Sequence, residues 1–234
     1  MTSIHLCHFK WGVMKTSEID IQISDHISLK GNLNIPDNSK AFVVFSHGSG
    51  SSRFSSRNRH VAEILNKHNI ATLLTDLLTE EEDRNYENRF NIDLLTDRLV
   101  IVTNQVVQLL GIKNLPVGYF GASTGAASAL KAAARLKGII QAVVSRGGRP
   151  DLAGHSLPEV KAPTLLLIGS LDTDVITLNQ QAYYKLNCEK EIQIVKGAGH
   201  LFEEPGKLNE VAKLATEWFN KHLVLKTKLI KLNE

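Results

Sequence analysis

Hydrophobic and polar residues alternate in two separate runs near the start of the chain. The alternating hydrophobic residues are Ile19, Ile21 and Ile23 in the first run and Ile27, Leu29, Leu33 and Ile35 in the second. This period places the apolar side chains on one face of an extended strand. The polar Ser24-Asp25-His26 segment between the runs is typical of a turn. The pattern therefore predicts an antiparallel hairpin with one face exposed to solvent.

Beyond residue 40 the apolar positions form short continuous runs, which are typical of strands buried on both faces of a sheet. The predicted strands cover residues 41–45, 70–74, 115–120, 139–145, 164–168 and 191–196. The predicted helices cover residues 60–66, 95–109, 124–136 and 177–186, and Leu208, Val211, Leu214 and Trp218 mark a last helix. We therefore predict an α/β fold with a mostly parallel sheet of about eight strands, which begins with the antiparallel hairpin and carries helices on both faces.

The length of 234 residues and the hydrophobic fraction of 43% suit one large core, so we expect a single domain over residues 1–234. Residues 1–15 are an atypical N-terminal extension in this scheme, and Met14 is an alternative start to Met1. Residues 224–234 form a lysine-rich tail. We expect this tail to be solvated or loosely docked, although a basic amphipathic helix at a membrane surface is the alternative.

Charge and cysteine content argue against several classes of function. The net charge of +3 is spread along the chain without a basic stripe, which argues against a nucleic-acid partner. Cys7 and Cys188 form no CxxC pair, so we expect neither a disulfide framework nor a zinc site. No run is long enough to span a membrane and residues 1–13 lack a signal-peptide pattern, so we expect a cytoplasmic protein without a membrane partner.

The sequence Gly121-Ala122-Ser123-Thr124-Gly125 lies between a predicted strand and a predicted helix. This context is that of a nucleophile elbow, in which a serine occupies a strained strand-to-helix turn with its hydroxyl exposed. Glycines two residues before and after the serine let the helix approach the strands closely, since a Cβ atom there would collide. Ser123 is therefore the candidate nucleophile.

An acid and a histidine follow later strands of the predicted sheet. Asp172 comes after strand 164–168 and His200 after strand 191–196, so both are expected at the edge of the sheet where Ser123 lies. The order serine, aspartate, histidine is the order associated with this elbow. Asp174 is an alternative acid, but the spacing Gly-x-x-Asp-x-x-Val favours Asp172.

Each of these residues has an expected chemical role. His200 would accept the proton of the serine hydroxyl, and Asp172 would hold the imidazole in the productive tautomer. The oxyanion hole would be formed by the backbone N–H of Thr124 and by one from the glycine-rich loop 47–50, for which we predict Ser49. His47 in the same loop is expected to be a structural hydrogen-bonding residue rather than a base.

Two further loops near the predicted site carry arginines. Arg53 and Arg146 could bind a substrate carboxylate or phosphate, which would make the substrate anionic. Alternatively, these arginines pair with the acidic run 80–83 and only shape the rim of the site. We expect that acidic run to be solvated rather than to bind a metal, and no histidine spacing matches a metal-ligand motif.

In combination these motifs resemble the α/β-hydrolase fold superfamily, and most closely its dienelactone hydrolase-like members, from about Ile19 to Leu223. The resemblance implies that Ser123, Asp172 and His200 are nucleophile, acid and base. Dienelactone hydrolases differ in carrying a cysteine nucleophile and a glutamate in the loop after the third strand, where this chain has Ser123 and the loop 47–50. A serine esterase on the same scaffold therefore fits better than a dienelactone hydrolase.

The expected function is a cofactor-free, metal-free serine hydrolase that cleaves small esters or lactones through an acyl-enzyme. Many similar hydrolases insert a lid after the sixth strand, but residues 146–163 are too few for a substantial lid domain. Two alternatives remain open at this point. One is a non-catalytic binding protein on a hydrolase scaffold. The other is a different reaction of the same triad, namely thioesterase, perhydrolase or lyase chemistry.

Overall fold

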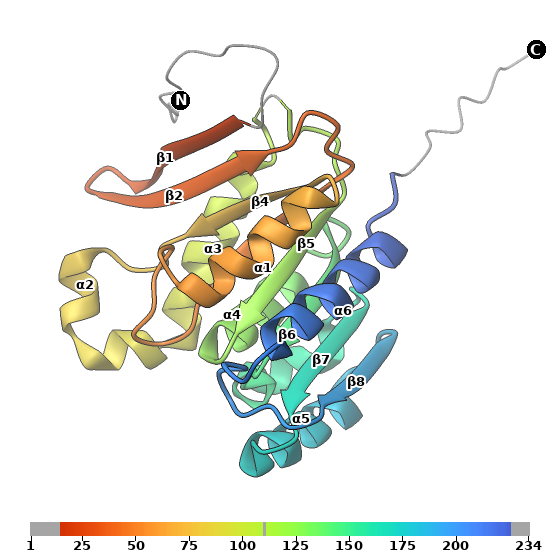
Figure 1. Ribbon diagram of the computed structural model, residues 1–234. Coiled ribbons are helices and arrows are strands. Elements are labelled where there is room, and N and C mark those ends of the chain that lie inside the picture. Colours follow the sequence, from red (N-terminus) through yellow and green to blue (C-terminus); the bar gives the residue numbers. More distant parts are fainter. Residues whose placement is uncertain (1–14, 110, 226–234) are drawn as a thin grey trace, which may run out of the picture.

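The computed structural model describes residues 15–109 and 111–225, which form an eight-stranded sheet flanked by helices (Figure 1). The strands are β1 (Lys15–Ser24), β2 (Ile27–Ile35), β3 (Ala41–Ser46), β4 (Ile70–Thr75), β5 (Val117–Ala122), β6 (Ile140–Arg146), β7 (Thr164–Gly169) and β8 (Lys190–Val195). Their order across the sheet is β1-β2-β4-β3-β5-β6-β7-β8. β2 runs antiparallel to both β1 and β4, whereas all other neighbours are parallel.

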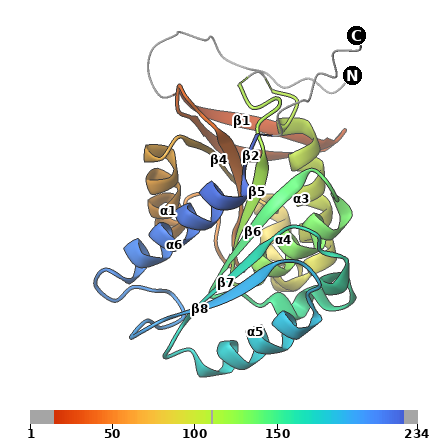
Figure 2. The ribbon, with the colours of Figure 1, turned by 90° about the vertical axis from the view of Figure 1, so that its right-hand side faces the viewer.

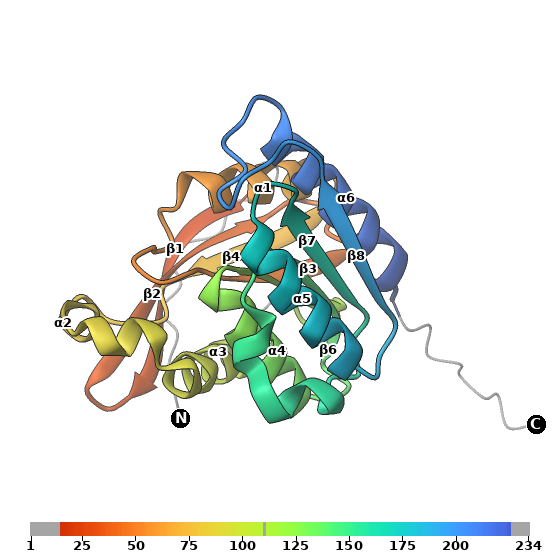
Figure 3. The ribbon, with the colours of Figure 1, turned by 90° about the horizontal axis from the view of Figure 1, so that it is seen from below.

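Helices cover both faces of the sheet (Figures 2 and 3). The α-helices are α1 (Ser56–Lys67), α2 (Glu80–Arg84), α3 (Ile92–Val106), α4 (Thr124–Arg135), α5 (Thr173–Lys185) and α6 (Lys207–His222). Two 3-10 helices, η1 (Tyr86–Phe90) and η2 (Pro150–Glu159), complete the described elements. Figure 3 shows α1 and α6 on one side of the sheet and α3, α4 and α5 on the other. The fold is therefore the predicted α/β architecture.

The N-terminal hairpin packs its predicted apolar face against α3. Ile21 pairs with Leu29 across the hairpin, and Ile19 pairs with Gly31. These isoleucines and Leu29 are buried and belong to the core cluster that includes α3 residues. Leu33 lies on the same face and is also buried. Alternation of apolar and polar residues thus placed one face of the hairpin in the core, as expected.

The predicted elements are all present, but several begin earlier than the hydrophobic pattern indicates. Helix α1 begins at Ser56 rather than at residue 60, because Ser55 caps it by accepting a hydrogen bond from the Asn58 N–H. Helix α5 begins at Thr173 rather than at residue 177. The first turn of a helix is often polar, so its apolar pattern starts about one turn late.

The acidic run 80–83 is helical and partly paired, which differs from the solvated loop that we expected. Thr79 and Glu82 form a capping box that starts the five-residue helix α2. Glu82 also accepts a hydrogen bond of 2.6 Å from the nearly buried Arg98. Glu80 and Glu81 are exposed, as predicted. So short and polar a helix has no hydrophobic period from which it could be predicted.

Within the described chain, only η2 and short loops separate β6 from β7, so no lid domain is inserted there. Among the described helices, none combines the length and the apolar character that crossing a membrane would require. Most of the predicted N-terminal extension 1–15, including Met14, and most of the lysine-rich tail 224–234 lie outside the described residues.

Candidate active site

Ser123 occupies a strained turn between β5 and α4. Its φ of 51° and ψ of −124° lie where residues other than glycine rarely occur. Its N–H donates to the Arg146 carbonyl at 3.2 Å, and its own carbonyl accepts from the Arg149 N–H at 3.0 Å. The Ser123 side chain makes no capping bond to α4. The backbone is thus fixed by the loop after β6, while the hydroxyl remains available for chemistry.

Two glycines permit the close packing that this turn requires. A Cβ atom on Gly121 would lie 2.5 Å from the Ala126 Cα atom, and one on Gly125 would lie 2.2 Å from the Ser46 carbonyl oxygen. Real Cβ atoms do not approach backbone atoms so closely. The start of α4 therefore lies directly against the ends of β3 and β5, as the glycine spacing predicted.

Asp172 and His200 form a hydrogen-bonded pair. His200 Nδ1 donates to Asp172 Oδ2 at 2.6 Å, and the exposed fractions of the two side chains are 38% and 15% respectively. Asp172 is the N-cap residue of α5, yet its carboxylate makes no capping bond and turns towards the imidazole instead. Asp174, in the first turn of α5, makes no hydrogen bond to His200. The geometry therefore favours Asp172 over Asp174 as the partner of the histidine.

Backbone contacts bring the loops after β7 and β8 together. The Leu171 N–H donates to the Ala198 carbonyl at 2.9 Å, and the Gly197 N–H donates to Ser170 Oγ at 2.8 Å. A Cβ atom on Gly169 would lie 2.3 Å from the Ala198 carbonyl oxygen, which measures how tightly the loops pack. These contacts fix the distance between the acid and the histidine.

The loop after β6 links this pair to the elbow. A Cβ atom on Gly147, whose φ is 50°, would lie 2.8 Å from the His200 carbonyl oxygen and 3.6 Å from His200 Nδ1. The preceding residue, Arg146, accepts the Ser123 N–H. Ser123 and His200 therefore contact neighbouring residues of one loop. Within the described chain no hydrogen bond joins Ser123 Oγ to His200, and such bonds commonly tighten only when substrate binds.

The loop after β3 lies beside Ser123, as predicted for an oxyanion loop. A Cβ atom on Gly48 would lie 2.9 Å from the Ser123 Cβ atom. The Ser49 N–H, which we predicted as an oxyanion donor, donates to Thr124 Oγ1 at 2.9 Å. The other predicted donor, the Thr124 N–H, belongs to the first helical residue of α4 and has no acceptor within the helix. The threonine hydroxyl that engages Ser49 was not singled out in the sequence.

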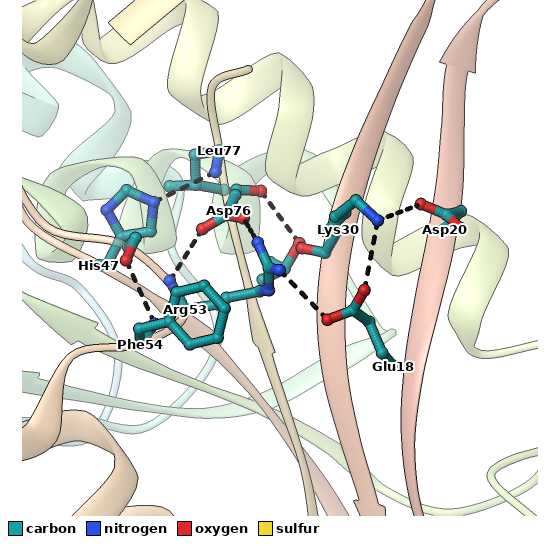
Figure 4. Close-up of polar contacts among 10 residues, drawn as sticks. Glu18, Asp20, Lys30, His47, Arg53, Phe54, Asp76 and Leu77 are labelled. Carbon is teal, nitrogen blue, oxygen red and sulfur yellow. Dashed lines mark hydrogen bonds and ion pairs between the residues drawn. The ribbon is translucent and has the colours of Figure 1, made fainter. Parts of the chain in front are cut away.

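His47 is a buried structural residue, in agreement with its expected role. Its Nε2 accepts a hydrogen bond from the Leu77 N–H at 3.2 Å, so its proton must reside on Nδ1, which donates to the Gly48 carbonyl at 2.9 Å. Burial lowers the pKa of His47 below its ordinary value. The neutral imidazole thus ties the loop after β3 to the loop after β4 (Figure 4).

Arg53 is held by carboxylates rather than being free to bind a substrate. Its guanidinium pairs with Asp76 and, at 3.2 Å, with Glu18 of β1, as Figure 4 shows. Its N–H also donates to Asp76 at 2.8 Å. Glu18 pairs in turn with Lys30. These partners differ from the acidic run 80–83, which the sequence offered as the alternative partner, and they let Arg53 join the hairpin to the loop after β3.

A cavity of about 370 Å³ lies beside this network. Its lining includes His47, Ser51 and Ser52 of the loop after β3, together with Phe54, Leu29 and Leu78. This volume is within the range of small-molecule pockets. Among the described residues, no cluster of three or more histidine, cysteine or acidic side chains is arranged to hold a metal ion.

Arg146 is buried without a carboxylate partner. It makes no ion pair in the described part of the chain, and its polar contact is a hydrogen bond of 3.2 Å to Asn58. Burial, together with repulsion from Arg57, lowers the pKa of Arg146 to about 10. The guanidinium lies 6.0 Å from the centre of the Phe202 ring, which follows His200 by two residues. An unpaired buried cation so close to the site remains a candidate for binding an anionic group.

Arg89 is a residue near the site that the sequence did not reveal. Its guanidinium is held by Asp83, and its Nη1 atom lies 3.9 Å from the position of a Cβ atom on Gly50. It therefore reaches the loop after β3 from η1. Arg89 reaches this loop because η1 lies next to it. No sequence pattern predicted the position of η1.

Comparison with known proteins defines the class of this fold and its family. The model of the dienelactone hydrolase family matches residues 29–226. A crystal structure of dienelactone hydrolase from Anabaena variabilis is 50% identical, with a TM-score of 0.87 over 91% of this chain and 100% of that one. Est1E from Butyrivibrio proteoclasticus is 17% identical, with a TM-score of 0.70 over 87% of this chain and 98% of that one, and shares the fold.

The fold is thus that of an α/β hydrolase, and the chain belongs to the dienelactone hydrolase family. Two curated Mycobacterium tuberculosis proteins named "Putative phosphoribosyl transferase" are each 51% identical to it over 210 residues, or 90% of this chain. The chain spans only 47% of the length of each of these relatives.

Replacing Gly125 tests the packing of the elbow. Gly125→Ala should lower the free energy of unfolding by about 3 kcal/mol, because the new methyl group must displace the Ser46 carbonyl. Gly138→Ala is the control, since a Cβ there meets no atom within 4 Å and only the positive φ opposes it, at a cost of about 1 kcal/mol. Urea denaturation measures both values, and equal losses would contradict the packing described.

The buried imidazole of His47 should make stability depend on pH. Because its pKa is lowered in the folded protein, the unfolded chain takes up the proton first as the pH falls below the ordinary value of 6.5. The free energy of unfolding should therefore be largest above this pH and decrease below it, by up to about 1.4 kcal/mol per pH unit.

The measurement is urea denaturation at about pH 7.5 and about pH 5.5. His47→Gln keeps an acceptor for the Leu77 N–H but does not titrate, so its stability should depend less steeply on pH. His26→Gln, in the exposed turn of the hairpin, should leave the wild-type dependence intact. A His47→Gln protein with the unchanged wild-type dependence would show that His47 is not responsible.

Proposed function

We propose that this protein is a serine hydrolase that cleaves small carboxylic esters or lactones. Ser123 is the nucleophile, His200 the general base and Asp172 the residue that orients the base. The observation that carries the proposal is the 2.6 Å hydrogen bond between His200 and Asp172, on loops adjoining the strained turn at Ser123. Membership of a hydrolase family supports the same reaction class.

The reaction proceeds in two steps through an acyl-enzyme. Ser123 Oγ attacks the substrate carbonyl while His200 Nε2 accepts the hydroxyl proton, and Asp172 keeps the other ring proton on Nδ1. The imidazolium then gives its proton to the departing alkoxide. A water molecule, deprotonated by His200, attacks the acyl-enzyme, and the proton returns to Ser123 Oγ as the acid leaves. No cofactor is needed for either step.

The negative charge on the carbonyl oxygen needs donors that are already in position. The Thr124 N–H is unengaged within α4 and is adjacent to the nucleophile, which makes it the first donor. The Ser49 N–H, on the loop next to Ser123, is the second group that we propose for the oxyanion hole, and in the resting site it donates to Thr124 Oγ1. Removing one such donor typically costs about a hundred- to thousand-fold in rate.

Small substrates suit the architecture best. No lid domain intervenes between β6 and β7. We favour an anionic substrate because Arg146 is buried near the site with no carboxylate partner among the described residues, so a substrate carboxylate could satisfy it. Arg53 is the weaker candidate for this role, because Asp76 and Glu18 already neutralise it.

The transferase name of the mycobacterial relatives adds no second candidate function. They share 90% of this chain, and the dienelactone hydrolase model matches residues 29–226 of it, so the shared part includes most of the hydrolase match. We therefore assign the hydrolase reaction to the shared part and propose that phosphoribosyl transfer, in those proteins, belongs to the part of their length that this chain does not cover.

A fluorophosphonate probe tests the nucleophile directly. The wild-type protein should gain one adduct in its intact mass, and Ser123→Ala should gain none. His200→Asn should react at least about a hundred-fold more slowly, since general-base assistance contributes that much or more. A panel of small esters and lactones should then show turnover in the wild type, with oxygen from labelled water in the released acid.

Asp172 and Asp174 provide a matched pair of control variants. Asp172→Asn should reduce kcat by about ten-thousand-fold, because the amide favours the wrong tautomer of His200. Asp174→Asn should react almost as the wild type does, since Asp174 makes no hydrogen bond to His200. A well-folded wild type without adduct or turnover would favour a binding protein, whereas turnover without solvent oxygen in the product would favour lyase chemistry.

A further inference from the structure

The hydroxyl of Thr124 differs in its hydrogen bonding from the hydroxyls of three other buried threonines in helices. Thr96, Thr103 and Thr216 each donate their hydroxyl proton to the carbonyl four residues earlier, at 2.6, 2.7 and 2.7 Å. Thr124 is the first residue of α4, so the residue four positions earlier belongs to β5. It therefore lacks the helical acceptor that the other three use.

A hydrogen bond from a residue outside α4 orients the hydroxyl of Thr124. Its Oγ1 accepts the Ser49 N–H at 2.9 Å, and the direction of this bond is certain because a backbone N–H can only donate. The residue is 5% exposed. A hydroxyl can accept one hydrogen bond and donate another, and no acceptor for the Thr124 proton occurs in the described part of the chain.

This unused proton lies between the nucleophile and the oxyanion loop. Thr124 follows Ser123 directly, and its hydroxyl contacts Ser49 across the gap between α4 and the loop after β3. The position of a Cβ atom on Gly48 is 3.7 Å from Ser123 Oγ, which shows how closely this loop approaches the nucleophile. An oxyanion formed at Ser123 must occupy this neighbourhood.

We propose that the Thr124 hydroxyl is itself an oxyanion donor, in addition to the Thr124 N–H. The Ser49 N–H then contributes through the threonine: it donates to Oγ1, and Oγ1 donates its proton to the developing oxyanion. Accepting the Ser49 bond polarises the hydroxyl and strengthens its own donation. Thr124 keeps its proton throughout and forms no covalent bond. The inference rests on the proposed function.

The arrangement also explains how Ser49 can be engaged in the resting site without blocking the reaction. If the Ser49 N–H donated directly to the oxyanion, it would first have to break its bond to Thr124 Oγ1. The Thr124 hydroxyl can donate to the oxyanion while it keeps its bond from Ser49, so no hydrogen bond has to break as the charge forms. The β-branched side chain has few χ1 rotamers, and the bond from Ser49 selects among them. Thr124 is thus preorganised before substrate arrives.

The test compares Thr124→Val with Thr124→Ser in hydrolysis of p-nitrophenyl acetate. Valine keeps the shape of threonine without the hydroxyl, so kcat should fall about a hundred-fold while KM changes little. Serine keeps the hydroxyl and should remain within about three-fold of the wild type. Inhibition by a boronic acid, which forms a tetrahedral anion on the nucleophile, should weaken in Thr124→Val by the same factor as kcat.

Thr216→Val is the matched control, because it removes a buried helical hydroxyl that bonds only within α6. Thermal melting checks that each variant folds, and Thr124→Ala replaces Thr124→Val if the latter does not.

Thr124→Val with wild-type or higher kcat would overturn the inference, and higher kcat would make Ser49 the direct donor. Thr124→Ser as slow as Thr124→Val would also overturn it. A wild type that neither turns over ester nor reacts with the fluorophosphonate would instead overturn the proposed function.

Discussion

Helix α4 lies so close to the end of β3 that its second residue, Gly125, has no room for a side chain. A Cβ there would approach the Ser46 carbonyl oxygen to 2.2 Å, and a Cβ on Gly121 would collide with the helix in the same way. This close packing forces the chain to turn sharply between strand and helix, and Ser123 takes a positive φ as a result. The strain is offset by the packing of the sheet, and its consequence is a hydroxyl presented at the edge of the sheet.

Backbone contacts position Asp172 and His200 relative to this turn, whereas side-chain contacts hold the loop after β3. The loop after β6 receives the Ser123 N–H and lies against His200, while the loops after β7 and β8 bond to one another. On the opposite side, neutral His47 and the Arg53–Asp76 pair hold the loop after β3. Groups held in place by such contacts before substrate binds are what preorganised catalysis requires.

Much of this arrangement was accessible from the sequence. Continuous apolar runs predict the parallel strands. Because the carboxyl ends of these strands meet at one edge, the sequence also predicts that Asp172 and His200 lie close together, as they do. Contacts between segments distant in sequence could not be obtained in this way. The partners of Arg53, the approach of Arg89 to Gly50 and the bond from Ser49 to Thr124 depend on side-chain geometry, which has no sequence period. Helix α2 was missed because five polar residues carry no hydrophobic pattern.

A crystal structure of the protein after reaction with a small phosphonate ester tests the central claim most directly, because the phosphonyl group mimics the tetrahedral intermediate. We expect a bond from phosphorus to Ser123 Oγ, with the phosphonyl oxygen within hydrogen-bond distance of the Thr124 N–H and the Thr124 hydroxyl. We also expect His200 Nε2 next to Ser123 Oγ, with Asp172 still bound to Nδ1. Phosphorus on another residue, or a phosphonyl oxygen that points away from Thr124 and the loop after β3, would contradict the proposed nucleophile and oxyanion hole.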